Sequence, residues 1–180
     1  MQTSERTEGR PSAASDVYLC PMPKEDTPLP SLPPLRAAEV AAASHPRVAR
    51  EKAFVWRLLE YAVEKSFGKK LSDLSPRKTP SGKWVAEGIW FSLSHTEGLL
   101  AVAVSGAPIG IDAEKKRDTF PDALCRRALT DEEYAALMAL PKEERGAAFT
   151  ALWTVKEAAF KMEGKEAFFP ARVSSALPHK

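Results

Sequence analysis

The chain has 180 residues, of which 44% are hydrophobic and 28% are charged, a balance typical of soluble globular proteins. Its formal net charge of +2 is too small to indicate a nucleic-acid or membrane partner, so any phosphate site must come from local clustering of basic residues. No apolar run approaches the roughly 20 residues of a membrane span, and the N-terminus lacks a signal peptide's apolar block. We therefore expect a cytoplasmic protein that binds neither nucleic acid nor membranes, with Cys20 and Cys125 as reduced thiols.

The first part of the chain predicts little regular structure. Residues 1–15 are polar and are expected to form a disordered tail. A short apolar run over 17–20 predicts a first strand. The prolines that follow make residues 21–34 an extended connector, because proline suits neither the interior of a helix nor a central strand.

Two helices are predicted next, a short Ala-rich one over 35–43 and a long one from about 46 to 67. Ser44 is the expected N-cap of the long helix, and Gly68 is its expected stop. Apolar residues recur at helical spacing along the long helix, which places one of its faces in the core.

Basic side chains stand at two notable points of this half. Arg47 and Arg50 lie on the first turns of the long helix, where they form either a solvated face or a phosphate contact near a helix start. Lys83 follows Gly82 at the end of a turn-rich loop. It is either an ordinary loop lysine or a phosphate contact from a backbone that glycine lets come close.

The most informative stretch begins with two apolar runs, 89–93 and 99–105, which predict strands joined by a turn. A third run, 109–111, also predicts a strand and ends at Asp112 and Glu114. Because side chains alternate along a strand, these two carboxylates are expected to project from the same face.

Two carboxylates held side by side repel each other unless a proton or a cation lies between them. Asp112 and Glu114 carry oxygen ligands of the kind that Mg²⁺ prefers, so they are candidate metal ligands. The alternative is a solvated strand end that the basic run 115–117 neutralises.

Three helices are predicted after this stretch. The first covers 120–129, and the second begins at a capping box over 130–133 and extends to about 140. The third runs from about 141 to 163 and stops at Gly164. Its predicted buried stripe consists of Ala148, Leu152, Val155, Ala159 and Met162.

Glu157 and Lys161 lie four residues apart beside that stripe, a spacing that often forms a surface ion pair worth only a few tenths of a kcal/mol, on the order of 0.3. Trp153 lies one turn earlier on the same side and indicates a packed flank instead. An acid and a base that are partly buried next to Trp are then candidates for a functional role.

Four motifs stand in order along the chain: SGKW, FSLSHT, IGIDAE and LWTVKEAAFKMEG. This series resembles the 4′-phosphopantetheinyl transferases, in particular the longer surfactin-synthetase-activating type. That family shows Gly-Lys-Pro, Asn-(hydrophobic)-Ser-His, Gly-(hydrophobic)-Asp-x-Glu and Trp-x-x-Lys-Glu-x-x-x-Lys. The similarity covers about residues 36–164, and its last two motifs are specific. Trp84 stands where the family has Pro, and Ser92 where it has Asn.

The resemblance implies an α/β fold in which two similar lobes each pack a small antiparallel sheet on a long helix, with the site in the cleft between them. It places the first lobe at 16–107 and the second at 108–180. After Gly164 the family continues through further strands, whereas sixteen residues remain here. The second lobe is therefore expected to be incomplete: 168–173 serves as a minimal strand, the chain is clipped, or another subunit completes the sheet.

The resemblance also implies a chemistry. The protein would transfer the 4′-phosphopantetheine group from coenzyme A to a serine hydroxyl of an acyl or peptidyl carrier protein, and release 3′,5′-adenosine diphosphate. Asp112, Glu114 and Glu157 would hold Mg²⁺ against the pyrophosphate of coenzyme A, and Glu157 would also be the base. Lys161 would stabilise charge on the leaving group. The protein is expected to act as a monomer, a pseudo-dimer of lobes.

The remaining implied contacts are to coenzyme A. They are assigned to Ser94, His95, Gly82, Lys83 and Lys156, with Lys156 either touching phosphate or merely solvated, and to Arg47 or Arg50 for the 3′-phosphate. Two other functions stay open. One is a non-catalytic module that binds coenzyme A or carrier proteins, and the other is an unrelated Mg²⁺-dependent nucleotide hydrolase.

Overall fold

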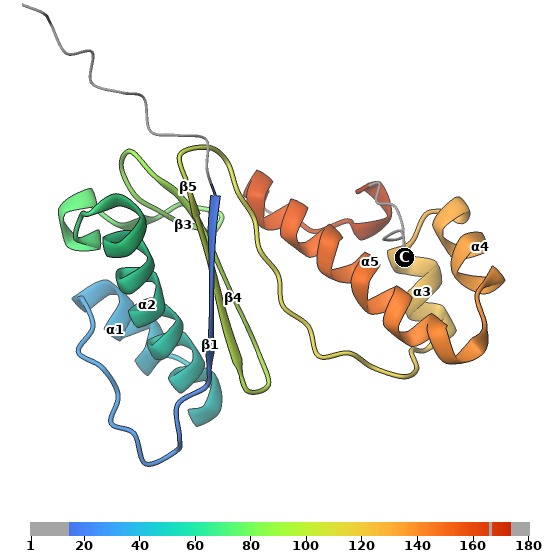
Figure 1. The fold of residues 1–180 in the computed structure, drawn as a ribbon, viewed down its shortest axis with the longest axis horizontal. Coiled ribbons are helices and arrows are strands. Elements are labelled where there is room, and N and C mark those ends of the chain that lie inside the picture. Colours follow the sequence, from blue (N-terminus) through green and yellow to red (C-terminus); the bar gives the residue numbers. More distant parts are fainter. Residues whose placement is uncertain (1–14, 166, 174–180) are drawn as a thin grey trace, which may run out of the picture.

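The computed structural model describes residues 15–165 and 167–173. Three strands form an antiparallel sheet in the order β1, β5, β4, with bounds Ser15–Pro21, Leu99–Ser105 and Trp90–Thr96. The long helix α2, Pro46–Phe67, lies on one side of this sheet, and a second long helix, α5, Lys142–Glu163, lies on the other side (Figure 1). The α/β class is therefore confirmed, whereas the expected tail of residues 1–14 lies outside the described residues.

The sheet register turns one set of side chains toward α2. Phe91 and Leu93 of β4 stand opposite Val104 and Val102 of β5, and all four side chains face α2. They pack with buried α2 residues, among them Trp56, Leu59 and Val63, into the largest hydrophobic cluster of the described residues. This burial is what the helical spacing of apolar residues in α2 predicts.

The short elements of this half complete the cluster. Helix α1, Pro34–Ala41, packs on α2, and a 3-10 turn, Leu71–Leu74, contributes two buried leucines. The two-residue strands β2, Arg77–Lys78, and β3, Trp84–Val85, form a small hairpin whose Trp84 ring meets Trp56 at a centroid distance of 4.6 Å.

The N-cap prediction for α2 is wrong by one residue. His45, and not Ser44, caps the helix, because its extended backbone lets Nδ1 accept a hydrogen bond from the Arg47 amide at 3.1 Å. The predicted stop is confirmed: Gly68 adopts φ 63°, a left-handed conformation that glycine adopts at no steric cost.

Residues 106–121 form an extended strap that runs from the end of β5 along α5 (Figure 1). The expected strand at 109–111 is wrong, because this segment packs against helix backbone and has no strand partner among the described residues. A Cβ at Gly110 would lie 1.8 Å from the Ala158 carbonyl oxygen, and one at Gly146 would lie 2.3 Å from the Arg117 carbonyl oxygen. Two glycines therefore allow the strap to touch α5 near both of the helix's ends.

The C-terminal part consists of helices α3, Asp122–Ala128, α4, Asp131–Ala139, and α5, followed by a 3-10 turn, Pro170–Arg172. The predicted capping box is confirmed at the start of α4, where Thr130 and Glu133 exchange side-chain-to-backbone hydrogen bonds. Between residues 106 and 173, the described part of the chain contains no strand. The second sheet is thus not seen, and the expected minimal strand over 168–173 is instead a 3-10 turn.

The predicted buried stripe of α5 is only partly right. Leu152 is buried, but Val155 is 48% exposed and Met162 is 38% exposed. The reason is that α3 and α4, rather than a sheet, cover α5, and they meet it at Phe149 and Leu152. No helix among the described residues combines the length and apolar character needed to cross a bilayer.

Candidate active site

Asp112 lies where the strap passes between β4 and the C-terminal end of α5. Its Oδ1 accepts hydrogen bonds from the Ser94 hydroxyl at 2.9 Å and from the Lys161 ammonium at 2.6 Å. Ser94 Oγ in turn accepts from Lys161 Nζ and from the Ala113 amide, both at 3.1 Å. Strand, strap and helix are therefore joined through one buried carboxylate.

The second oxygen of Asp112 carries a signal of its own. The Asp112 side chain is 3% exposed, and Oδ2 is buried with no hydrogen-bond partner within the described residues. A buried charged oxygen of this kind is costly unless a cation or a donor satisfies it. An Asp oxygen left without a donor fits the hard-cation ligand that the sequence predicts.

Glu157 lies on the same side of α5 as Lys161, and its Oε2 is 3.9 Å from the Lys161 ammonium. Burial raises the pKa of Glu157 above its ordinary value, and the negative charge of Asp112 adds to this, with Glu114 contributing further. The Lys161 charge opposes the rise. The two strap carboxylates and Glu157 are thus close enough to repel one another, as carboxylates meant to share a cation would be.

The three carboxylates do not converge on one point. Glu114 is exposed on the strap, and within the described residues no group of three His, Cys, Asp or Glu side chains is arranged to hold a metal ion. Lys161 Nζ is the cationic group that contacts both Asp112 and Glu157. Within the basic run 115–117, Lys115 contacts Glu97 at 2.7 Å.

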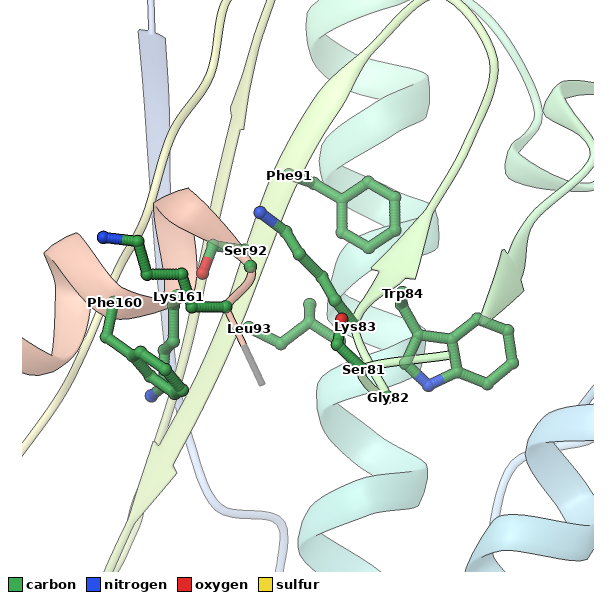
Figure 2. Close-up of a pocket in the computed structure, with 11 residues that line it drawn as sticks. Ser81, Gly82, Lys83, Trp84, Phe91, Ser92, Leu93, Phe160 and Lys161 are labelled. Carbon is green, nitrogen blue, oxygen red and sulfur yellow. The ribbon is translucent and has the colours of Figure 1, made fainter. Parts of the chain in front are cut away.

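A cavity of about 390 Å³ opens beside this carboxylate cluster. Figure 2 shows Lys83 and Trp84 from the hairpin on one side, Phe160 and Lys161 from α5 on the other, and β4 between them. Lys83 crosses to α5 and donates to the Met162 carbonyl at 2.8 Å, and burial lowers its pKa. Gly82, which also lines the cavity, adopts φ 83° in the hairpin turn.

His95 follows Ser94 on β4 but faces α2. Its Nδ1 lies 3.1 Å from Oε2 of Glu51, a buried carboxylate on the first turns of that helix. Burial lowers the pKa of His95, and the Glu51 charge opposes that change, whereas the charges of Lys161, Arg36 and Lys52 add to it. The imidazole is therefore paired with an acid and also feels the charge of the Lys161 ammonium.

Glu51 is a residue that the sequence analysis missed. Glu51 stands four residues before the buried Val55 on α2, and residues at this spacing lie on the same face of a helix. The sequence therefore placed an acid on the buried face, and this could have drawn attention to it. Such an acid needs a partner, and His95 provides it.

The structure places three of the residues predicted to contact coenzyme A as follows. Arg50 donates to the carbonyls of Lys24 and Thr27 at 2.6 and 2.9 Å, so its guanidinium fastens the proline-rich connector to α2. Arg47 remains 62% exposed, with Nε 3.8 Å from Glu51. The Ser94 hydroxyl is committed to Asp112, and the residue itself is buried.

Lys156 is buried in the structure. Its side chain is 0% exposed, and its ammonium lies 2.7 Å from Glu133 Oε2 in the C-terminal helical cluster. Of the two expected settings, the solvated surface is therefore wrong. The physical reason is that α4 covers the flank of α5 that carries Lys156.

Comparison with known proteins shows what part of this chain is similar to. Residues 108–179 match the family model of the 4′-phosphopantetheinyl transferase superfamily. The chain is 39% identical to the 4′-phosphopantetheinyl transferase psf-1 of Bacillus pumilus over 75 residues, which is 42% of this chain and 32% of that protein. It is 33% identical to Sfp of Bacillus subtilis (strain 168) over 90 residues, 50% of this chain and 40% of Sfp.

A third relative comes from a different genus. The chain is 34% identical over 93 residues to AcpT of Salmonella typhimurium, named as a 4′-phosphopantetheinyl transferase, which is 50% of this chain and 48% of AcpT. The chain thus spans less than half the length of these relatives. The region that matches the superfamily model, 108–179, carries Asp112, Glu114, Glu157 and Lys161.

Proposed function

We propose that this chain transfers the 4′-phosphopantetheine group of coenzyme A to a serine hydroxyl of a carrier protein. One observation carries the proposal. In a region that matches the transferase superfamily, one buried oxygen of Asp112 has no hydrogen-bond partner among the described residues. Its other oxygen is held by Ser94 and Lys161, and Glu157 lies 3.9 Å from the same ammonium. These carboxylates are placed to hold a cation beside the Lys161 ammonium, and phosphoryl transfer requires such positive charge against the phosphates.

The chemistry assigns a task to each group. The serine oxygen attacks the β-phosphorus of coenzyme A, a new P–O bond forms, and the bond to the 3′,5′-adenosine diphosphate breaks. Glu157 takes the serine proton as the general base. The Lys161 ammonium stabilises the negative charge that develops on the departing diphosphate.

Asp112, Glu114 and Glu157 are the residues proposed to hold Mg²⁺, which when bound supplies positive charge against the pyrophosphate. Asp112 Oδ2, which has no hydrogen-bond partner within the described residues, supports Asp112 as a ligand, whereas Glu114 and Glu157 would have to move toward it. Lys83 and Gly82 line the cavity of about 390 Å³, which we assign to the nucleotide. The exposed Arg47 is proposed to contact the 3′-phosphate, because Arg50 is occupied by the connector. His95 is also proposed to contact a phosphate.

We also propose that residues 16–107 and 108–180 act as the two lobes of one catalytic unit. The support is that Ser94 of β4, from the first range, contacts Asp112, the Ala113 amide and Lys161, all from the second.

The test is transfer to an apo carrier protein. With coenzyme A and Mg²⁺, the carrier is expected to gain the mass of one phosphopantetheine group. D112A is expected to abolish the adduct, and E157Q to slow its formation by about 10²- to 10⁴-fold, the usual contribution of a general base. D118A, which removes an exposed carboxylate of the same strap, is the matched control and should keep the wild-type rate.

Three results would count against the proposal. Full activity in D112A would show that the Asp112 carboxylate is not needed for the transfer. Binding of coenzyme A without a mass shift across a panel of carriers would favour a non-catalytic module, and release of free phosphopantetheine without a carrier would favour a hydrolase.

A further inference from the structure

The Lys156 ammonium is fully buried, although it stands next to the proposed base Glu157 on α5. It lies 2.7 Å from Glu133 Oε2, and it donates to the carbonyls of Pro170, at 3.0 Å, and Val173. An ammonium group has three donors, so this group is fully satisfied by three acceptors from two other segments. A buried charge of this kind keeps its place only with its partners.

The carboxylate of Glu133 has a second role. Its Oε2 also accepts the backbone amide of Thr130 at 2.9 Å, which closes the capping box at the start of α4. The Lys156 ammonium thus joins three elements: the middle of α5, the first turn of α4, and the 3-10 turn Pro170–Arg172.

These contacts fix the rotation of α5. Consecutive residues are about 100° apart around a helix, so locking the direction of Lys156 also sets the direction of Glu157. On the adjoining flank, Lys161 is fastened to Asp112 at 2.6 Å. Contacts on two sides of α5 therefore fix its rotation, and they orient Glu157 toward the strap.

We infer that Lys156 is a positioning residue for the transfer reaction and makes no contact with coenzyme A. The inference rests on the proposed function, because it assigns Glu157 as the base. A contact with phosphate would require Lys156 to abandon three acceptors inside the helical cluster. The cavity assigned to the nucleotide is lined by Lys83 and Lys161 and does not reach Lys156.

The test is a double-mutant cycle on the full-length chain, with K156M, E133Q and the double variant. A misplaced base is expected to lower kcat by about 10- to 100-fold in each single variant, because small displacements in a reacting geometry cost that much. The affinity for coenzyme A, measured by calorimetry, should stay within about twofold of wild type. The double variant should be no slower than the slower single variant, since two residues that act through one contact are non-additive.

A control separates positioning from simple loss of stability. Arg145 also fastens α5 to the end of α4, donating to the carbonyls of Met138 and Leu140 at 2.7 and 2.9 Å, but it lies twelve residues from Glu157. R145M should lower the melting temperature and leave kcat unchanged at temperatures well below melting. K161M, by contrast, should weaken binding of coenzyme A.

Each outcome decides the matter. If K156M weakens coenzyme A binding as K161M does, or if R145M lowers kcat as much as K156M, the inference is overturned. If the wild type binds coenzyme A but transfers nothing, the proposed function fails and the positioning role falls with it. The contact of Lys156 with Glu133 and the turn Pro170–Arg172 is then tested separately by the rate of tryptic cleavage after Arg172. K156M and E133Q should increase this rate, whereas R145M should not.

Discussion

The two halves of the molecule are each centred on a 22-residue helix, and they use it differently. Both α2 and α5 end at a left-handed glycine, Gly68 with φ 63° and Gly164 with φ 65°. Helix α2 lies on a three-stranded sheet and buries a continuous apolar face, whereas α5 lies among helices and the strap. The elements match in length and ending, but their partners do not.

That difference decides what each helix buries. The buried face of α2 is nearly all apolar, and its exception, Glu51, is paired with His95. On α5 the fully buried residues include a lysine, while Val155 and Met162 remain exposed. A flat sheet accepts a whole apolar stripe, whereas two short crossing helices cover a smaller patch. The proposed site lies at the boundary, where β4 meets α5 through Asp112.

Truncating one core residue in each half tests whether the halves fold separately. Leu59 is 0% exposed in the sheet-side cluster, and Phe149 is 1% exposed in the helical cluster, 4.1 Å from the Phe120 ring. L59A should cost about 2–5 kcal/mol and F149A about 3–5 kcal/mol. Unfolding in urea is measured by circular dichroism and tryptophan fluorescence. We expect F149A to unfold the C-terminal helices at a lower urea concentration than in wild type and to leave the urea midpoint of the sheet-side half unchanged.

The two variants serve as controls for each other. If both of them shift one common unfolding transition by the same amount, the two halves form a single cooperative unit and do not fold separately.

A methyl group at Gly110 tests the boundary itself. The added carbon would lie 1.8 Å from the Ala158 carbonyl oxygen, so the strap must move away from α5. Overpacking of this kind costs about 1–3 kcal/mol, and here it also displaces Asp112, two residues along the strap. G110A is therefore expected to lower both the melting temperature and the transfer rate.

Gly88 provides the matched control. It has open space around it but φ 73°, so G88A should cost about 1–2 kcal/mol through backbone strain and leave the strap in place. If G88A lowers the transfer rate as much as G110A does, then the loss reflects stability and not the position of Asp112.

Local signals along the chain were sufficient for several elements. The bounds of α2, the capping box of Thr130 and Glu133 and the stop at Gly164 each depend on a few neighbouring residues, and all three are confirmed. The motif residues Asp112 and Lys161 could be singled out for the same reason, since each belongs to a short pattern with fixed spacing.

Features that depend on distant partners were not predictable. The strand expected at 109–111 has the right composition, but its neighbour turned out to be a helix backbone, reached through Gly110. The burial of Lys156 depends on Glu133 and on carbonyls 14 and 17 residues further along the chain. Periodicity within one helix cannot say which of its flanks another segment will cover.

The smallest expected effect concerns acid stability of the sheet-side half. Glu39 on α1 accepts hydrogen bonds from Lys78 Nζ at 3.0 Å and Trp84 Nε1 at 2.9 Å, and it pairs with the buried Arg36 at 2.6 Å. Burial alone would raise the pKa of Glu39, but these partners outweigh it and hold the pKa at about 2.

A carboxyl group whose pKa is lower in the folded state stabilises the protein above its ordinary pKa. That contribution is lost as the pH falls from about 4.5 toward about 2, because the unfolded chain takes up the proton first. E39Q is expected to be less stable than wild type by about 1–2 kcal/mol at pH 6, with the difference narrowing by pH 3. Urea midpoints at the two values measure this.

Glu87 supplies the comparison for that series. Its carboxylate is 69% exposed and 3.8 Å from an exposed Arg77, so E87Q should change the urea midpoint little at either pH, as for most surface pairs. A constant gap between E39Q and wild type from pH 6 to pH 3 would mean that the Glu39 charge adds nothing to stability. The acid sensitivity of this half would then have to arise elsewhere than at the junction of α1, α2 and the hairpin.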